Sequence, residues 1–258
     1  MMRSLLVLIG FFVVMALKSC GPTPVEELKK NGVSYTKEAF VKSAGEGDEK
    51  VVALFIASEM GVDVSNGWQE TPLIKASETG EVDVVKMLLE AGAYVDHREK
   101  RGRTPIHLAA QNGHTQIVKL LLENGAYVDS RSRRHRITPL IYAASAGHLE
   151  TVKVLVANEA KINTTQKEGG TALMNASFGG HYDVVKWLLD NGAEVNRQVV
   201  DGYTALMYAC EKGHAQIVKM LLQNGADMNL SMENGLTALD IARHYEQDDV
   251  VALLESNS

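Results

Sequence analysis

The chain has 258 residues, of which 45% are hydrophobic and 22% are charged, a composition that excludes wholesale disorder. Its 32 acidic and 26 basic side chains give a formal net charge of −6, so the protein as a whole is repelled by nucleic acid and anionic lipid. Two cysteines, Cys20 and Cys210, can form one bridge at most, so the chain is not a disulfide scaffold.

The first 19 residues predict an export signal. Arg3 precedes an unbroken apolar run of thirteen residues, from Leu5 to Leu17. A membrane-spanning helix takes about 20 apolar residues, so this run is too short to span a bilayer but fits the core of a signal peptide. A buried helix of a globular domain is disfavoured, because the run has no polar face and Gly21 and Pro22 follow it closely.

The run ends in LKSC, which resembles the bacterial lipobox, with Leu17 three residues before Cys20 and the small Ser19 just before it. The resemblance implies that the Cys20 thiol takes a lipid and that the chain is cut before Cys20. Lys18 departs from the pattern, so an ordinary cleaved signal and an uncleaved anchor remain alternatives. Loss of residues 1–19 removes two cations, and the mature charge becomes 24 − 32 = −8.

A threonine followed by proline or alanine then recurs at spacings of 33, 34, 33, 33 and 33 residues. These threonines are Thr71, Thr104, Thr138, Thr171, Thr204 and Thr237. A threonine hydroxyl caps a helix N-terminus, and proline suits the first helical turn, where a backbone N–H has no partner. A glycine and a second amphipathic helix follow, as in 149–156. Such short helix pairs bury a core only by stacking on their neighbours.

One such unit reads TPIHLAAQNGHTQIVKLLLENGAYVD, and on these motifs the chain resembles the ankyrin repeat family over residues 36–255. The resemblance implies an all-α solenoid of helix-turn-helix repeats with β-hairpin tips, which binds other proteins through its tips and inner helices. We expect a tether over 20–35 and a monomeric solenoid of about seven repeats over 36–258. The repeats span 36–65 (a degenerate N-cap), 66–98, 99–131, 132–165, 166–198, 199–231 and 232–258 (a C-cap).

Several residues suggest chemistry, but each has a structural interpretation. One histidine per repeat follows a glycine, at His114, His148, His181 and His214. Equivalent helices stack about 8–10 Å apart, too far for their side chains to share one zinc ion, so we expect these histidines to bond backbone at the turns. Cys210 stands in a small-residue slot, which predicts a buried, inert thiol. No catalytic, cofactor or metal motif is present, so we do not expect an enzyme.

The tip between Asp129 and Thr138 breaks the repeat rule. It holds eight intervening residues where the other repeats have seven, and Arg136 replaces a tip glycine such as Gly102. With the preceding tip it gathers eight of the 26 basic residues: Arg98, Lys100, Arg101, Arg103, Arg131, Arg133, Arg134 and Arg136. A solvated turn is the alternative to a binding site.

Arginine pairs bidentately with carboxylates, so we expect an acidic protein surface as the partner of this tip, with anionic lipid headgroups as a second candidate. Nucleic acid is disfavoured, because no aromatic residue interleaves the arginines for stacking. Apolar residues at other tips and inner positions extend the expected surface, since aromatic residues are enriched at interface hot spots. These are Trp68, Ile137, Phe178, Val199, Val200 and Tyr203.

Glu159 is a further anomaly, because other repeats carry glycine at this helix end, as at Gly192. A Cβ in the left-handed conformation costs about 1 kcal/mol, so we predict an altered turn there. Together the patterns predict an exported, lipid-anchored module on the periplasmic face of the bacterial envelope. It would bind a protein as a scaffold, inhibitor or immunity protein. The alternative is a secreted effector that binds a host protein.

Overall fold

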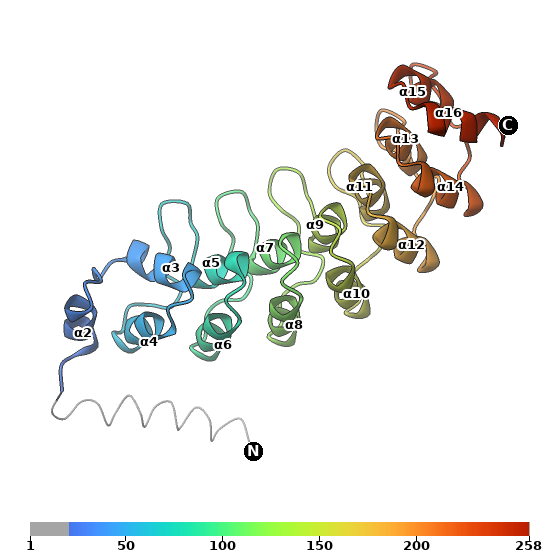
Figure 1. Ribbon diagram of the computed structural model, residues 1–258. Coiled ribbons are helices and arrows are strands. Elements are labelled where there is room, and N and C mark those ends of the chain that lie inside the picture. Colours follow the sequence, from blue (N-terminus) through green and yellow to red (C-terminus); the bar gives the residue numbers. More distant parts are fainter. Residues whose placement is uncertain (1–20, 258) are drawn as a thin grey trace. The chain divides into compact units, whose positions relative to one another are not determined.

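The computed structural model describes residues 21–257 (Figure 1). These residues form two compact units, one that ends at Glu99 and one that begins at Lys100. The predicted signal peptide and the predicted lipid site at Cys20 lie outside the described residues. Between residues 21 and 257 all named elements are helices, and one isolated bridge joins Ser231 and Thr237. The predicted all-α class is therefore confirmed, and the tips are hairpin turns rather than paired strands.

The first unit contains α2 (Pro24–Lys30), α3 (Lys37–Gly45), α4 (Glu49–Ala57), α5 (Pro72–Thr79) and α6 (Val82–Glu90). Helix α3 packs against α5, and α4 packs against α6, as expected for stacked helix pairs.

The segment that we expected to be a tether, 20–35, differs from that expectation, because it contains α2. Helix α2 packs against α4, and its Leu28 is fully buried. The side chains of Thr23 and Glu26 form a capping box, and Pro24 stands at the first helical position. The prolines of this segment therefore start a helix instead of preventing one, because the first helical turn does not need the missing N–H.

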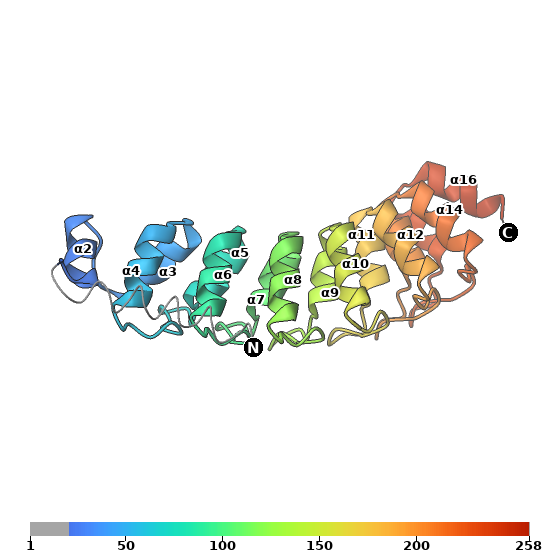
Figure 2. The ribbon, with the colours of Figure 1, turned by 90° about the horizontal axis from the view of Figure 1, so that it is seen from below.

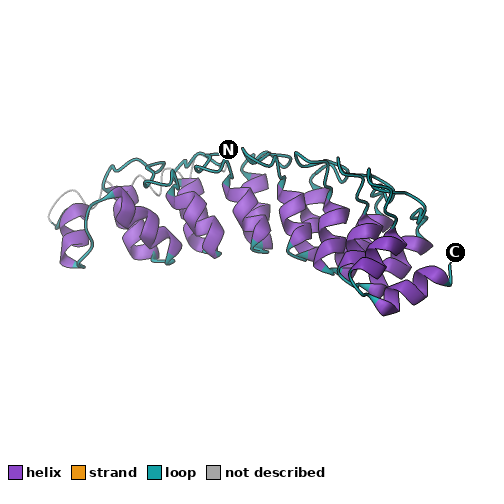
Figure 3. Ribbon diagram, turned by 90° about the horizontal axis from the view of Figure 1, so that it is seen from above, coloured by secondary structure: helices purple, strands orange, loops and turns teal. Residues whose placement is uncertain are grey.

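The second unit repeats one pair of helices, as Figure 2 shows from α7 to α16. The inner helices are α7 (Pro105–Gln111), α9 (Pro139–Ser145), α11 (Ala172–Gly179), α13 (Ala205–Glu211) and α15 (Ala238–His244). The outer helices are α8 (Thr115–Glu123), α10 (Leu149–Ala157), α12 (Tyr182–Asp190), α14 (Ala215–Gln223) and α16 (Asp248–Glu255). Each helix packs against its pair partner and against the equivalent helix of the next pair. Within this unit the long loops gather along one side of the helices (Figure 3).

Threonine caps and buried aliphatic residues fix each pair in place. In α9 the Thr138 hydroxyl accepts a hydrogen bond from the Ile141 N–H at 3.4 Å, and in α13 Thr204 accepts from Met207 at 3.2 Å. Val152 of α10 is fully buried, and burial of such a side chain contributes about 1.5–3 kcal/mol. None of the helices in residues 21–257 is both long enough and apolar enough to cross a membrane.

The turn at Glu159 keeps the ordinary geometry, so our prediction of an altered turn is wrong. Glu159 takes the left-handed conformation at φ 69°, close to the 88° of Gly192 in the next repeat. The Ala160 N–H donates to the Leu155 carbonyl at 3.0 Å, as the Ala193 N–H donates to the Leu188 carbonyl at 3.0 Å. The hydrogen bonds that close the helix, together with burial of Ala160, outweigh the steric cost of the Glu159 Cβ.

We predict that Glu159→Gly raises the free energy of unfolding by about 1 kcal/mol, because glycine adopts the left-handed conformation without a Cβ clash. Urea unfolding followed by circular dichroism measures the change. The mirror variant Gly192→Glu, at the equivalent turn, is expected to lower the free energy by a similar amount. A free energy for Glu159→Gly equal to or below that of the parent would contradict the prediction.

Candidate functional site

The ordinary tip of the second unit is a hairpin turn of three residues. In repeat five the Gln166 N–H donates to the Gly170 carbonyl at 2.9 Å, and the Gly169 N–H donates back to the Gln166 carbonyl at 3.1 Å. Gly169 has φ 96°, the left-handed residue that closes a hairpin loop of this length. Backbone hydrogen bonds therefore close the loop in repeat five, and at the tip of repeat six the Gln198 side chain adds a bond to the Gly202 carbonyl at 2.8 Å.

The tip of repeat four has four residues, Arg133 to Arg136, which we call the arginine tip. The Ser132 N–H donates to the Ile137 carbonyl at 3.0 Å, and the Arg136 N–H donates to the Ser132 carbonyl at 3.2 Å. The same two closing bonds as in repeat five therefore enclose one more residue. Arg136 occupies the left-handed position at φ 56°, where the other tips of this unit have glycine. The insertion inferred from the spacing thus lies at the very end of the hairpin.

Backbone hydrogen bonds join each tip of the second unit to the next. The Arg133 N–H donates to the Arg101 carbonyl at 3.0 Å, and the Lys167 N–H donates to the His135 carbonyl at 2.8 Å. The arginine tip thus uses one backbone N–H toward the preceding tip and one backbone carbonyl toward the next. In repeat five the equivalent groups belong to the adjacent residues Lys167 and Glu168. In the arginine tip they belong to Arg133 and His135, with Arg134 between them. The inserted residue is therefore held between two anchored neighbours, and its side chain is exposed.

His107 of α7 holds the base of the arginine tip, a role that the sequence reasoning missed. Its ring is fully buried, and Nδ1 accepts a hydrogen bond from the Thr104 backbone N–H at 3.0 Å. Nε2 therefore carries the proton and lies 3.0 Å from the Ser130 carbonyl and 3.1 Å from the Ile137 carbonyl. The sequence could have indicated this role, because repeats five and six have the apolar Met174 and Met207 in the buried slot where repeat three has a polar histidine.

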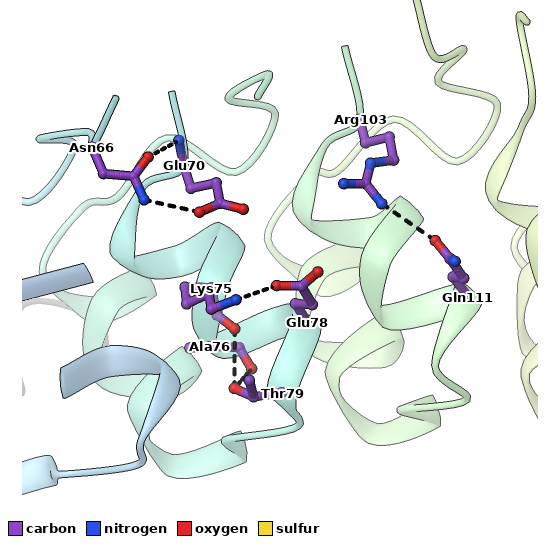
Figure 4. A network of polar contacts seen from close by, with 8 residues as sticks. All are labelled: Asn66, Glu70, Lys75, Ala76, Glu78, Thr79, Arg103 and Gln111. Carbon is purple, nitrogen blue, oxygen red and sulfur yellow. Dashed lines mark hydrogen bonds and ion pairs between the residues drawn. The ribbon is translucent and has the colours of Figure 1, made fainter. Parts of the chain in front are cut away.

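The structure divides the eight predicted basic residues into three groups. Arg98 belongs to the first unit and is exposed. Arg103 and Arg131 of the second unit are half-buried and bonded within the fold, Arg103 to the Gln111 side chain at 3.4 Å (Figure 4) and Arg131 to the Thr165 carbonyl at 3.3 Å. The remaining five are exposed on two joined tips of the second unit: Lys100, Arg101, Arg133, Arg134 and Arg136.

Four of these exposed guanidinium groups form no ion pair within residues 21–257, namely those of Arg101, Arg133, Arg134 and Arg136. Asp129, at the base of the same tip, instead accepts a hydrogen bond from the Lys161 backbone N–H at 3.2 Å. The positive charge of the arginine tip is therefore directed to solvent and available to an acidic partner.

The predicted apolar residues occupy different places. Trp68 lies on a tip of the first unit and is 64% exposed, in a turn that Asn66 orders by a 2.8 Å hydrogen bond to the Glu70 carboxylate (Figure 4). In the second unit Val200 is exposed, whereas Ile137 and Val199 are half-buried.

Phe178 and Tyr203 meet Tyr208, a residue that sequence reasoning missed, and the three form what we call the aromatic cluster. The rings of Tyr203 and Tyr208 have centroids 4.8 Å apart, and those of Phe178 and Tyr208 are 5.8 Å apart. Tyr208 and Phe178 project from the inner helices α13 and α11, and Tyr203 stands at the base of a tip. The sequence could have indicated Tyr208, because it stands on an inner helix four residues after Thr204. Tyr142 stands at the equivalent position of repeat four.

The residues that suggested chemistry have structural roles. Nε2 of His148, His181 and His214 lies 3.1, 2.9 and 3.2 Å from a backbone carbonyl of the preceding repeat, as expected. Burial raises the pKa of the Cys210 thiol to about 12, so this buried group is not a thiolate near neutral pH. In the part of the chain that the structure describes, no group of three or more candidate ligands could hold a metal ion.

Comparison with known proteins agrees with this architecture. Two family profiles match: ankyrin repeats (3 copies) over residues 40–132 and 131–199, and ankyrin repeats (many copies) over residues 180–222 and 208–254. Among solved structures, the human ASB11 ankyrin repeat domain has a TM-score of 0.76 and 28% identity, with 83% of this chain and 96% of that chain covered. Curated protein sequences give no match.

Stacked helix pairs with exposed, variable tips define a repeat-built scaffold for protein binding. The profile matches extend over most of the described residues, and the chain belongs to the ankyrin repeat family.

We predict that His107→Met lowers the free energy of unfolding by about 1–3 kcal/mol, because methionine fits the slot but removes the hydrogen bonds that the buried imidazole makes with the Thr104 N–H and the Ser130 and Ile137 carbonyls. The amide of Arg136 should exchange with deuterium faster in this variant. Met174→Leu, at the equivalent slot of repeat five, is the control and should cost less than about 1.5 kcal/mol. Equal stability of His107→Met and the parent would show that the imidazole does not support the tip.

Proposed function

We propose that this chain is an exported, lipid-anchored ankyrin module that binds an acidic protein in the bacterial envelope. In this role it would serve as a scaffold, inhibitor or immunity protein. The observation that carries the proposal is the arginine tip, a four-residue hairpin whose three arginines are exposed and form no ion pair within the described chain. The N-terminal apolar run and the LKSC sequence around Cys20 support export and anchoring.

Keeping these charges together on one tip costs free energy. Like charges on neighbouring residues repel one another, and Arg136 also holds the left-handed conformation, which costs about 1 kcal/mol in a non-glycine residue. Such costs are typical of surfaces that function in binding. On a protein with a formal net charge of −6, a local basic tip attracts carboxylates, raises the association rate and fixes the orientation of the partner.

The arginine tip can be tested by affinity capture from envelope extract, with the wild-type domain and the variant Arg133→Glu/Arg134→Glu/Arg136→Glu as baits. We expect an acidic protein to be retained by the wild type and lost by the variant, since both attraction and bidentate pairing are removed. Mass spectrometry of the retained proteins identifies the partner.

The control bait is Lys119→Glu/Lys186→Glu/Lys219→Glu, which makes the same charge change at exposed positions of the outer helices. It should retain the partner as the wild type does. Equal retention by all three baits would make the arginine tip a solvated turn.

The proposed anchor predicts that Cys20→Ala moves the protein from the membrane fraction to the soluble fraction, because the thiol that would carry the lipid is lost. Cell fractionation with immunoblotting measures the distribution. Cys210→Ala is the control and should leave the distribution unchanged, since alanine fills the same buried slot at Ala110 and Ala144. A Cys20→Ala variant that stays in the membrane fraction would favour an uncleaved anchor, whereas a parent protein already found outside the membrane fraction would favour the alternative of a secreted effector.

A further inference from the structure

The tips of the second unit form one continuous row that extends past the arginine tip. Beyond repeat four, the Val200 N–H donates to the Glu168 carbonyl at 3.1 Å, and the Glu233 N–H donates to the Asp201 carbonyl at 3.3 Å. With the bonds described above, these contacts order all the tips of this unit from Arg101 to Glu233. Side chains on this row therefore keep a fixed sequence in space.

The charge changes sign along this row. Its first part carries Arg101 and the arginine tip, and Lys167 is its last cation. Its second part carries Glu168, Asp201 and Glu233, all exposed and without an ion-pair partner within residues 21–257. The row of tips is therefore positively charged at one end and negatively charged at the other.

The aromatic cluster lies beside the acidic end. The Lys212 ammonium sits 4.4 Å from the centroid of the Phe178 ring and 2.9 Å from the Glu211 carboxylate. The chain's own lysine thus places a cation over one ring of the cluster and next to a carboxylate, an arrangement that is electrostatically favourable.

The tyrosines of this cluster also lie in a negative field. Burial raises the pKa of Tyr203 to about 12, and the charge of Glu211 adds to the shift. Burial also raises the pKa of Tyr208, with further contributions from Glu211, Asp201 and Glu168. Both phenols stay neutral near pH 7, and a cation placed over Tyr203 would be attracted by the ring and by Asp201 and Glu168, whereas Glu211 already pairs with Lys212.

We infer that the second unit binds a polypeptide segment of mixed charge in one direction, with its carboxylates over the arginine tip and a basic side chain over Tyr203, beside Asp201 and Glu168. This inference rests on the proposed function, because the same arginine tip provides one end of the contact. It adds the chemistry of the partner: an acidic block and a basic block on one segment. An acidic protein without the basic block would gain nothing from the acidic end of the row.

The spacing of the two blocks follows from the repeat. Packed helices lie about 8–10 Å apart, so the tips of repeats four and six are separated by about 16–20 Å. An extended chain covers this distance with about six residues. The probe is therefore a fluorescent peptide with a glutamate block, a Gly-Ser spacer of about six residues and an arginine block, which we call the bipolar peptide.

Fluorescence anisotropy compares the bipolar peptide with an acid-only peptide, in which serine replaces the arginine block. A scrambled peptide with the composition of the bipolar one controls for net charge. We expect the wild-type protein to bind the bipolar peptide about tenfold more tightly than either of the others.

Variants at the acidic end decide whether this advantage comes from the proposed contact. Glu168→Lys/Asp201→Lys should abolish it, and Tyr203→Leu should weaken binding of the bipolar peptide alone by about threefold. The control Glu123→Lys/Asp190→Lys makes the same charge change at the ends of outer helices and should preserve the advantage. Thermal unfolding of each variant establishes that it is folded.

The outcomes separate this inference from the proposed function. If the wild type binds the bipolar and acid-only peptides equally, and Arg133→Glu/Arg134→Glu weakens both, the inference is wrong while the arginine tip remains a docking site. If Tyr203→Leu leaves the affinity for the bipolar peptide unchanged, the proposed contact between a basic side chain and the Tyr203 ring is wrong. If no peptide binds, or if Arg133→Glu/Arg134→Glu has no effect, both the inference and the docking role of the arginine tip fail.

Discussion

The stacking of short helices on their neighbours is the interaction on which each unit depends. The helices have seven to nine residues, well below the length at which an isolated helix is stable in water. Their stability comes from burial of one face, as for Leu140 and Val152, against the equivalent helices of the adjoining repeats. Threonine caps set where each inner helix begins, so that these faces stay in register from pair to pair.

Because the core is supplied by the helices, the tips can change without loss of the fold. The inserted residue of repeat four is accommodated by the same two closing hydrogen bonds, with buried His107 beneath them. Arg136 and Glu159 both keep a conformation that favours glycine, because the surrounding hydrogen bonds prescribe it. A repeat architecture therefore tolerates locally costly residues at its surface, which is where a partner can make use of them.

The contrast between a fixed helical core and variable tips also explains why the histidines and Cys210 have structural roles, whereas the charges on the tips point to a partner. His148, His181 and His214 direct a ring nitrogen to a backbone carbonyl, and Cys210 is fully buried. On the tip row, by contrast, exposed arginines and carboxylates lack ion-pair partners within the described residues. The recognition of a charged polypeptide that we propose rests on that arrangement, since charges left unpaired in the folded chain can be paired by a partner.

The sequence by itself determined the repeat, its period, the caps, the inert histidines and the insertion between Asp129 and Thr138, because these depend on local chemistry and on spacing. It could not determine α2, where a capping box and a buried Leu28 override the appearance of a proline-rich tether. Only the tertiary structure showed that Glu159 keeps its turn, that Tyr208 joins Phe178 and Tyr203, and that the tips form one hydrogen-bonded row. The tip row and the Phe178–Tyr208 contact join residues about one repeat apart, whereas the Glu159 turn and the Tyr203–Tyr208 contact depend on how the local chain folds. A sequence pattern records which residues recur but not which of them touch.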